Sequence, residues 1–203
     1  MELLGMGLSK MKVIGLTGGI GTGKSVASSY LEKKGYKVID ADKVAREVVK
    51  DGSPLLKVLV DTFGPKIIKG DGSLDRKALG ELAFSSAEKN KRLNQIMHKA
   101  IIDVIREKIK YYEKEDPNQV VFLDAALLFE TGLERDCNQI WLLCVDLETR
   151  LGRICQRDGL SKNQVMARIN SQMPQKEKEA KSDLLIDNSA TPEMLYKQLD
   201  KLI

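Results

Sequence analysis

Short apolar runs alternate along the chain with longer stretches in which apolar residues recur at every third or fourth position. The runs are apolar at consecutive positions, which is typical of strands buried on both faces of a parallel sheet. The longer stretches have the spacing of amphipathic helices. The pattern therefore predicts an α/β protein with a parallel sheet of about five strands flanked by helices. The expected strands lie at 13–16, 36–39, 120–124, 140–145 and 184–186.

Residues 43–116, between the second and third runs, show only helical spacing. Ser85 with Glu88 has the form of a capping box that opens the last helix of this stretch. That helix keeps one apolar stripe from Leu93 to Tyr112. We therefore expect residues 43–116 to form a helical insertion beside the sheet.

A second helical region follows the fourth run, at residues 150–178. Asp158-Gly159 forms a hinge-like turn within it, and Ser161 with Gln164 has the form of another capping box. Its size and positive charge predict a helical lid. The rest of the chain is expected to form the core of a single domain at 12–203. The core segments are 12–42, 117–149 and 179–203.

Composition limits the function only weakly. The chain has 203 residues, 42% hydrophobic and 31% charged, which suits one globular domain. A net charge of +4 with 5% aromatic residues predicts no nucleic-acid partner, and no apolar stretch approaches the roughly 20 residues of a membrane span. The three cysteines lack C-x-x-C spacing, so we expect reduced thiols and a cytoplasmic location. Residues 1–11 lack the pattern of a leader peptide and are expected to be a poorly ordered extension.

A glycine-rich loop follows the first predicted strand. Residues 18–25 read GGIGTGKS, which matches the P-loop signature between a strand and a helix. Its backbone N–H groups and the positive end of the following helix would form an anion cradle. Lys24 would reach the β- and γ-phosphates of a nucleotide, Ser25 would bind Mg²⁺, and the N–H of Val26 would approach the α-phosphate. The residues predicted to bind the nucleotide in this loop are Gly21, Thr22, Gly23, Lys24, Ser25 and Val26.

Carboxylates follow the second and third predicted strands. Asp40 and Asp42 come directly after 36–39, and Asp124 ends 120–124. Ligands of parallel α/β sheets bind beyond the carboxyl ends of the strands, so these side chains are expected on the same edge as the P-loop. Asp124 could hold Mg²⁺, hold a water on it or position a substrate. The alternatives are an Asp-rich surface turn for the pair and a helix cap for Asp124.

Three arginines mark the start of the predicted lid. Arg150, Arg153 and Arg157 are spaced by three and four residues, which places them on one helix face. Three guanidinium groups in a row suit a triphosphate, while a solvated helix face is the alternative interpretation. We expect Arg150 and Arg153 to bind the nucleotide and Arg157 to act on the transferring phosphoryl group.

Five motifs follow one another along the chain. They are GLTGGIGTGKS at 15–25, DAD at 40–42 followed by Arg46, LLFE at 127–130 after Asp124, RDGLS at 157–161 with Arg168 and Gln172, and IDN at 186–188. Taken together, these segments resemble dephospho-CoA kinases from about residue 12 to the end of the chain. The chain departs from the usual family pattern at Ala126 and Lys99, where the family commonly has proline. The resemblance implies a P-loop kinase that phosphorylates the ribose 3′-hydroxyl of dephospho-CoA with ATP, the last step of coenzyme A synthesis.

The residues suggest how such a kinase would work. Asp42 would accept or orient the hydroxyl proton as general base, and Asp40 would orient the acceptor. Lys24 and Mg²⁺ would neutralise charge between the β- and γ-phosphates. Arg46 would bind substrate or steady the Asp42 carboxylate, and Asp124 is also assigned to the substrate.

Two other functions stay open at this point. A P-loop kinase of the nucleoside monophosphate type would share the loop and the lid, but would lack the DAD and LLFE segments. A nucleotide-dependent switch is the other, although a GTPase would want an Asn-Lys-x-Asp motif, and Asn90-Lys91 is followed by Arg92-Leu93. The expected partners are therefore small-molecule substrates, with a monomer or a small homo-oligomer as the assembly.

Overall fold

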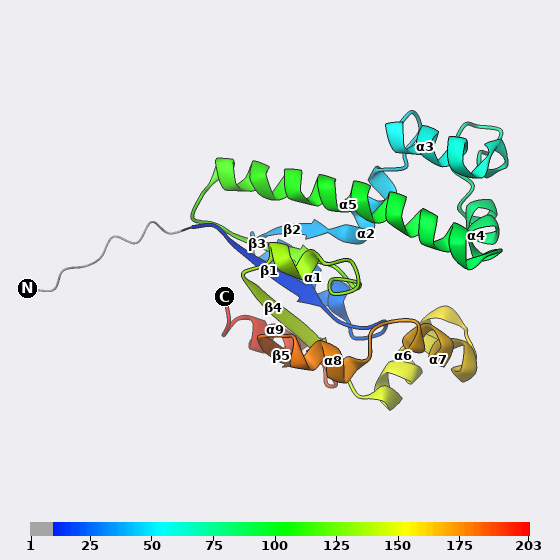
Figure 1. Ribbon diagram of the computed structural model, residues 1–203. Coiled ribbons are helices and arrows are strands. Elements are labelled where there is room, and N and C mark those ends of the chain that lie inside the picture. The colour runs from blue at the N-terminus through cyan, green and yellow to red at the C-terminus, as the bar shows by residue number, and fades with distance from the viewer. Residues whose placement is uncertain (1–9) are drawn as a thin grey trace, which may run out of the picture. The chain divides into compact units, whose positions relative to one another are not determined.

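The computed structural model describes residues 10–203, and its sheet confirms the predicted fold class (Figure 1). The five strands lie in the order β2-β3-β1-β4-β5. β1 pairs in parallel with β3 and β4, and β4 pairs in parallel with β5. This order puts β1, which leads into the P-loop, in the centre of the sheet. The strands are β1 (Lys12–Thr17), β2 (Lys37–Asp40), β3 (Val120–Asp124), β4 (Gln139–Cys144) and β5 (Leu184–Asp187).

The structure divides into two compact units. One is Asp40–Lys108, and the other comprises the chain before it and after it. The unit that contains the sheet has helices α1 (Lys24–Lys33), α6 (Leu147–Asp158), α7 (Lys162–Asn170), α8 (Gln175–Ala180) and α9 (Pro192–Leu199), with a 3-10 turn η2 (Leu133–Asp136). The Asp40–Lys108 unit has α2 (Ala41–Glu47), α3 (Pro54–Phe63), the 3-10 turn η1 (Pro65–Ile67), α4 (Arg76–Phe84) and most of α5 (Ala87–Glu115).

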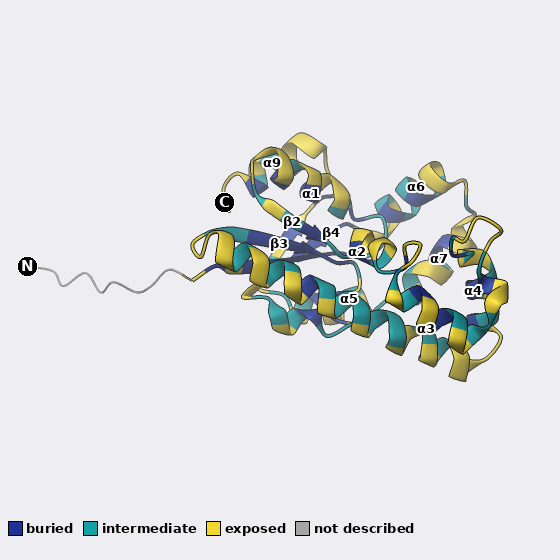
Figure 2. Ribbon diagram, turned by 90° about the horizontal axis from the view of Figure 1, so that it is seen from above, coloured by how far each residue is buried: buried dark blue, intermediate teal, exposed yellow. Residues whose placement is uncertain are grey.

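One face of the sheet packs against α1 and α9. Tyr30 of α1 stacks on Tyr196 of α9, with ring centroids 4.2 Å apart. The central strands β1, β3 and β4 are mostly buried, and the sheet is largely dark blue in Figure 2. Apolar side chains from four strands and both helices form one cluster, because consecutive apolar runs place a residue of each strand on this face. Its buried members are Ile14, Leu16, Ala27, Leu31, Phe122, Trp141, Leu143, Ile186, Leu195 and Leu199.

The Asp40–Lys108 unit has a core of its own. Ser53 caps α3, Asp75 caps α4, and Ile68 forms an antiparallel bridge with Leu74 between these helices. The helical spacing of the sequence therefore places one apolar stripe per helix inward. The buried members of this core are Val49, Leu56, Leu59, Ile67, Leu74 and Leu79.

Some expectations for the segments differ from the structure or are not tested by it. The cap of α5 is one residue later than predicted, since Ser86 and not Ser85 accepts a hydrogen bond from the N–H of Lys89. The capping box of Ser161 and Gln164 is confirmed. The expected extension at 1–11 lies mostly outside the described residues, and Met11 is buried. The boundaries of the core segments, of the insertion at 43–116 and of the lid at 150–178 stay predictions.

Candidate active site

The P-loop has the backbone geometry of an anion cradle. Gly21 and Gly23 adopt φ angles of 83° and 82°, which glycine tolerates and other residues rarely adopt. Within the described chain no side chain caps the N-terminus of α1, and its first turn carries no acidic residue. The N–H of Val26 donates to the Gly23 carbonyl at 2.9 Å, whereas the N–H groups of Lys24 and Ser25 and the positive end of the helix dipole remain available to an anion.

Lys24 and Asp124 form a buried ion pair beside this loop. The ammonium group of Lys24 donates to one carboxylate oxygen of Asp124, and the hydroxyl of Ser28 donates to the other. Asp124 is only 4% exposed, and it lies opposite Leu16 in the pairing of β3 with β1. Both oxygens of Asp124 are thus held by α1. The part played by Ser28 was not predicted, although its position four residues after Lys24 places both side chains on one face of α1.

The three arginines of α6 have three different partners. Arg150 is 5% exposed, and its Nε donates to the carbonyl of Ile20 at 3.1 Å. Arg153 donates to the carbonyl of Ala190 at 3.2 Å. Arg157 forms two hydrogen bonds with the neighbouring Asp158, of 2.7 and 3.0 Å. In this structure, Arg150 therefore supports the P-loop backbone, while Arg157 pairs with the turn at the end of α6.

A buried asparagine contacts the second half of the P-loop. The amide of Asn188 donates to the carbonyl of Thr22 at 2.8 Å, and Asn188 is 6% exposed. A Cβ atom on Gly23 would lie 2.3 Å from the Asn188 nitrogen, so only glycine fits there. Asn188 belongs to one of the motifs of the sequence, but no role was predicted for it. A lone amide side chain carries no pattern that reveals its partner.

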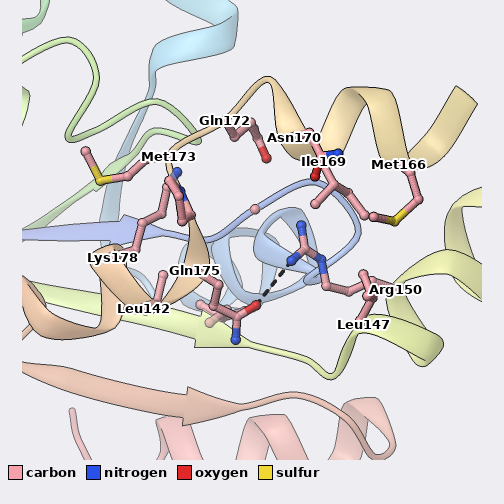
Figure 3. A pocket seen from close by; sticks show the side chains of 13 residues that line it. Leu142, Leu147, Arg150, Met166, Ile169, Asn170, Gln172, Met173, Gln175 and Lys178 are labelled. Carbon is pink, nitrogen blue, oxygen red and sulfur yellow. Dashed lines mark hydrogen bonds between the residues drawn. The ribbon is translucent and has the colours of Figure 1, made fainter.

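A pocket of about 480 Å³ opens beside Gly19 of the P-loop (Figure 3). Its wall is mostly apolar, with Arg150, Asn170, Gln172, Gln175 and Lys178 as polar groups. The apolar part comes from the end of β4, from α6 and α7, and from the segment that leads into α8. Those residues are Leu142, Leu143, Leu147, Met166, Ile169, Met173 and Pro174.

Lys178 is a buried cation next to this pocket. It is 2% exposed, and its Nζ donates to the carbonyl of Ala126 and pairs with Glu130, both at 3.0 Å. Burial alone would raise the pKa of Glu130, but the N–H of Met173 and the Lys178 ammonium outweigh it and lower that pKa. The LLFE segment is therefore bound to α8 by a charged pair.

The acidic pair and Arg46 lie in the Asp40–Lys108 unit. β2 ends at Asp40, whose side chain caps α2 by accepting from the N–H of Lys43 at 2.9 Å. Because the helix begins at Ala41, Asp42 lies in its first turn and is exposed. The Nε of Arg46 donates to the Asp42 carbonyl at 3.2 Å, so the Asp42 carboxylate is not its partner in this bond.

The described residues contain neither a cluster of metal-binding side chains nor a membrane-spanning helix. Within residues 10–203, no three His, Cys, Asp or Glu side chains are grouped as they would be to hold a metal ion. In the same range, no helix combines the length and the apolar character needed to cross a bilayer.

Comparisons with known proteins agree with this geometry. The family described as "Dephospho-CoA kinase" matches residues 12–193. A dephospho-CoA kinase of Shouchella clausii is 46% identical over 92% of this chain and 94% of its own length. Among solved structures, the protein TT1252 of Thermus thermophilus is 33% identical with a TM-score of 0.81, covering 95% of this chain and 96% of its own. A dephospho-CoA kinase from Campylobacter jejuni is 29% identical with a TM-score of 0.72, covering 95% of this chain and 97% of its own.

The resemblance found in the sequence motifs is thus confirmed along nearly the whole chain. The family match includes the P-loop, the acidic pair, the LLFE segment and α6 to α8. The chain belongs to the dephospho-CoA kinase family.

Proposed function

We propose that this protein transfers the γ-phosphoryl group of ATP to the ribose 3′-hydroxyl of dephospho-CoA, giving coenzyme A and ADP. The observation that carries the proposal is the P-loop, with its uncapped helix end and Lys24, in a chain of this family. A triphosphate would bind along the N–H groups from Gly21 to Val26. Lys24 would leave Asp124 and reach the terminal phosphates, while Ser28 keeps the Asp124 carboxylate in place.

Mg²⁺ fits the oxygen donors of this loop. The Ser25 hydroxyl is exposed in the first turn of α1, next to the place proposed for the phosphates. Hard oxygen donors suit this ion, which is commonly held by one or two protein groups together with substrate phosphates. When bound, it would supply positive charge at the transferring phosphoryl group. Asp124 lies beside the same helix and is the second candidate for holding it, directly or through water.

The α6 arginines would act around the triphosphate in different ways. Arg150 would hold the loop that binds it. Arg157 would exchange its bond with Asp158 for the transferring phosphoryl group when residues 150–178 close as a lid. Closure would also exclude water from the phosphoryl group.

Asp42 is the proposed general base. Its carboxylate is exposed at the start of α2, free of the capping bond that Asp40 makes. An exposed carboxylate can accept or orient the proton of an incoming hydroxyl. Asp40 would orient the acceptor, and Arg46 would bind substrate beside Asp42.

Reduced cysteines are consistent with a cytoplasmic location, which we also propose. Cys137, Cys144 and Cys155 are all free thiols. Burial raises the pKa of Cys137 to about 12, and burial with the nearby Glu179 raises the pKa of Cys144 to about 11. Both thiols would therefore stay protonated at neutral pH. A monomer or a small homo-oligomer remains the expected assembly.

The proposal is tested by measuring ADP release from MgATP with dephospho-CoA, AMP or adenosine as acceptor. Turnover with dephospho-CoA alone is expected, with the product phosphorylated at the ribose 3′ position. Turnover with AMP alone would assign the chain to nucleoside monophosphate phosphorylation instead. ATP binding without turnover of any acceptor would favour a nucleotide-dependent switch.

Substitution of the acidic pair tests the assignment of the base. Asp42→Asn is expected to lower kcat by about 10²-fold or more, because the amide cannot accept the proton. The KM for ATP should change little in the same steady-state assay. Asp40→Asn is the matched variant, and a larger loss of kcat there would show that the base is assigned to the wrong carboxylate.

A further inference from the structure

Both polar backbone groups of Ile20 are bound by side chains from outside the P-loop. The N–H of Ile20 donates to the amide oxygen of Gln172 at 3.0 Å. Its carbonyl accepts from Nε of Arg150 at 3.1 Å. Arg150 comes from α6 and Gln172 from the segment after α7, so two parts of the 150–178 region grip one residue of the loop. We call this pair of bonds the Ile20 clamp.

The clamp depends on the absence of a side chain at position 19. A Cβ atom on Gly19 would lie 2.5 Å from Nη2 of Arg150 and 3.4 Å from the amide oxygen of Gln172. The guanidinium group and the amide therefore pack directly on the Gly19 backbone. This glycine serves the approach of protein side chains in addition to the approach of phosphates.

The segment that carries Gln172 is itself held firmly. The N–H of Met173 donates to Glu130 at 2.9 Å, and Glu130 pairs with the buried Lys178. Gln175 accepts from Nη1 of Arg150 at 3.1 Å, the bond drawn as a dashed line in Figure 3. The figure also shows Gln172 extending from the same segment above the P-loop. Arg150 is thus bound both to Ile20 and to Gln175, which belongs to the same segment as Gln172.

The two halves of the P-loop are joined by the bonds that the N–H and hydroxyl of Thr22 donate to the Gly19 carbonyl, but they have different supports from outside the loop. In the second half, the Gly23 carbonyl accepts bonds from the N–H groups of Val26 and Ala27 in α1. The Thr22 carbonyl before it accepts a bond from the amide of Asn188. Ile20 precedes this region. Loss of the clamp should therefore loosen the start of the loop and leave the helix end, with Lys24, in place.

We propose that Gln172 is a positioning residue for phosphoryl transfer, acting through the Ile20 amide to hold the start of the P-loop in its productive shape. The proposal rests on the proposed kinase function. Because the helix end and Lys24 would still bind the triphosphate, loss of Gln172 should affect kcat more than the KM for ATP. The same contact makes the shape of the loop depend on the 150–178 region.

The test compares Gln172→Met with Gln119→Met. Methionine has similar length but offers no amide oxygen to Ile20. Gln119 is also half-buried, and its side chain donates one hydrogen bond to backbone, to the Tyr112 carbonyl at 2.6 Å. It directly precedes β3 at the amino end of that strand. Gln172→Met should lower kcat with dephospho-CoA by roughly fivefold to tenfold, the factor that one hydrogen bond provides. Gln119→Met should leave kcat unchanged.

Gln172→Glu separates positioning from simple support of the fold. Its carboxylate still accepts from the Ile20 N–H, so kcat should recover most of the loss seen with methionine. Its negative charge lies beside the phosphate cradle, so the KM for ATP should rise at low salt and return toward the normal value as salt increases. Equal kinetics for the methionine and glutamate variants would overturn the proposal.

A second measurement does not depend on turnover. The Ile20 amide should exchange its hydrogen at least about fivefold faster in Gln172→Met than in the unsubstituted protein, as followed by NMR, and Gln119→Met should not accelerate it. Unchanged Ile20 exchange, or unchanged kcat in a protein that phosphorylates dephospho-CoA, would overturn the role of Gln172. Absence of turnover in the unsubstituted protein would instead contradict the proposed function, while accelerated Ile20 exchange in Gln172→Met would still support the clamp.

Discussion

At the scale of single residues, Lys24 shows how one side chain serves two purposes. In the structure it neutralises the buried Asp124, and we propose that it binds phosphate when ATP is present. Water is nearly excluded from Asp124, so this carboxylate needs a polar partner at all times. Ser28 is the partner that remains when Lys24 moves.

Lys24→Met should therefore impair both catalysis and stability. We expect kcat to fall by about 10²-fold or more, because the positive charge on the terminal phosphates is lost. The urea midpoint should also fall, since the buried Asp124 keeps only Ser28. The double variant Lys24→Met with Asp124→Asn should recover stability and not activity. Normal turnover of Lys24→Met would contradict the P-loop assignment.

His98 is the only histidine and provides a pH test of the Asp40–Lys108 unit. Burial lowers the pKa of His98 below its ordinary value of 6.5. Below pH 6.5 the unfolded chain binds a proton at His98 more readily than the folded chain does. The contribution of the neutral, half-buried His98 to stability is therefore complete above pH 6.5 and is lost as the pH falls. Urea unfolding from pH 7.5 to 5.5 should therefore show a decline that is smaller in His98→Gln. Equal slopes for both proteins would exclude this effect.

Single residues of the site were predictable to different degrees. Lys24 and Ser25 follow from a local motif whose chemistry is known. The pairing of Lys24 with Asp124 joins positions 100 residues apart, and neither residue alone indicates it. The nucleotide contact of Arg150 stays a prediction, and the bond of its guanidinium group to the loop backbone could not be derived, because spacing defines a helix face and not the direction of a side chain.

At the scale of elements, the strands were easier to predict than the helix ends. Each of the five short apolar runs predicted a strand of a parallel sheet, and all five form strands. The ends of helices depend on one hydrogen bond. Ser85 and Ser86 are adjacent and chemically equal, so the sequence offers two caps for α5 one residue apart, and the later one is used.

α8 illustrates an element that composition describes poorly. Its sequence, QKEKEA, is polar except for the final alanine, and such a short helix gains little from propensity alone. It is held because Lys178 is buried against the Ala126 carbonyl and Glu130. A charged residue, not an apolar stripe, is therefore the anchor of this helix.

Lys178→Met tests that anchor. Methionine fills a similar volume but leaves the Ala126 carbonyl and Glu130 without their cation, so the free energy of unfolding should fall by about 1 to 3 kcal/mol. Urea denaturation monitored by circular dichroism measures it. Lys99→Met is the matched control, because Lys99 pairs with Asp103 on the surface and should contribute no more than roughly 0.5 kcal/mol. Equal losses for the two variants would contradict the anchoring role.

At the scale of the whole molecule, two cores are built from separate stretches of chain. The core under the sheet uses residues from both ends of the sequence, whereas the Asp40–Lys108 core uses a continuous stretch. The sequence indicated this division through the absence of strand-like runs between 43 and 116. Which residues of that stretch contact substrate could not be derived, because helical spacing identifies the buried face of a helix only.

The separate cores predict separable effects of core substitutions. Leu59 and Leu31 are fully buried, one in each core. Leu59→Ala and Leu31→Ala should each lower the free energy of unfolding by about 2 to 5 kcal/mol. At 25 °C, MgATP affinity measured by calorimetry should stay within about twofold in Leu59→Ala and fall in Leu31→Ala, since only Leu31 lies on the P-loop helix. A larger loss of affinity in Leu59→Ala would contradict this separation.

The stacking of α1 on α9 also bears on how the protein is made. The hydroxyl of Tyr30 donates to Asp200 at 2.6 Å, across 170 positions of the sequence. During synthesis, the helix that follows the P-loop emerges from the ribosome long before the segment that covers it. Its apolar face must therefore stay unburied, or be shielded by a chaperone, until α9 is translated. The helix that carries Lys24 is therefore translated well before α9, and it gains this covering only after residue 200 has left the ribosome.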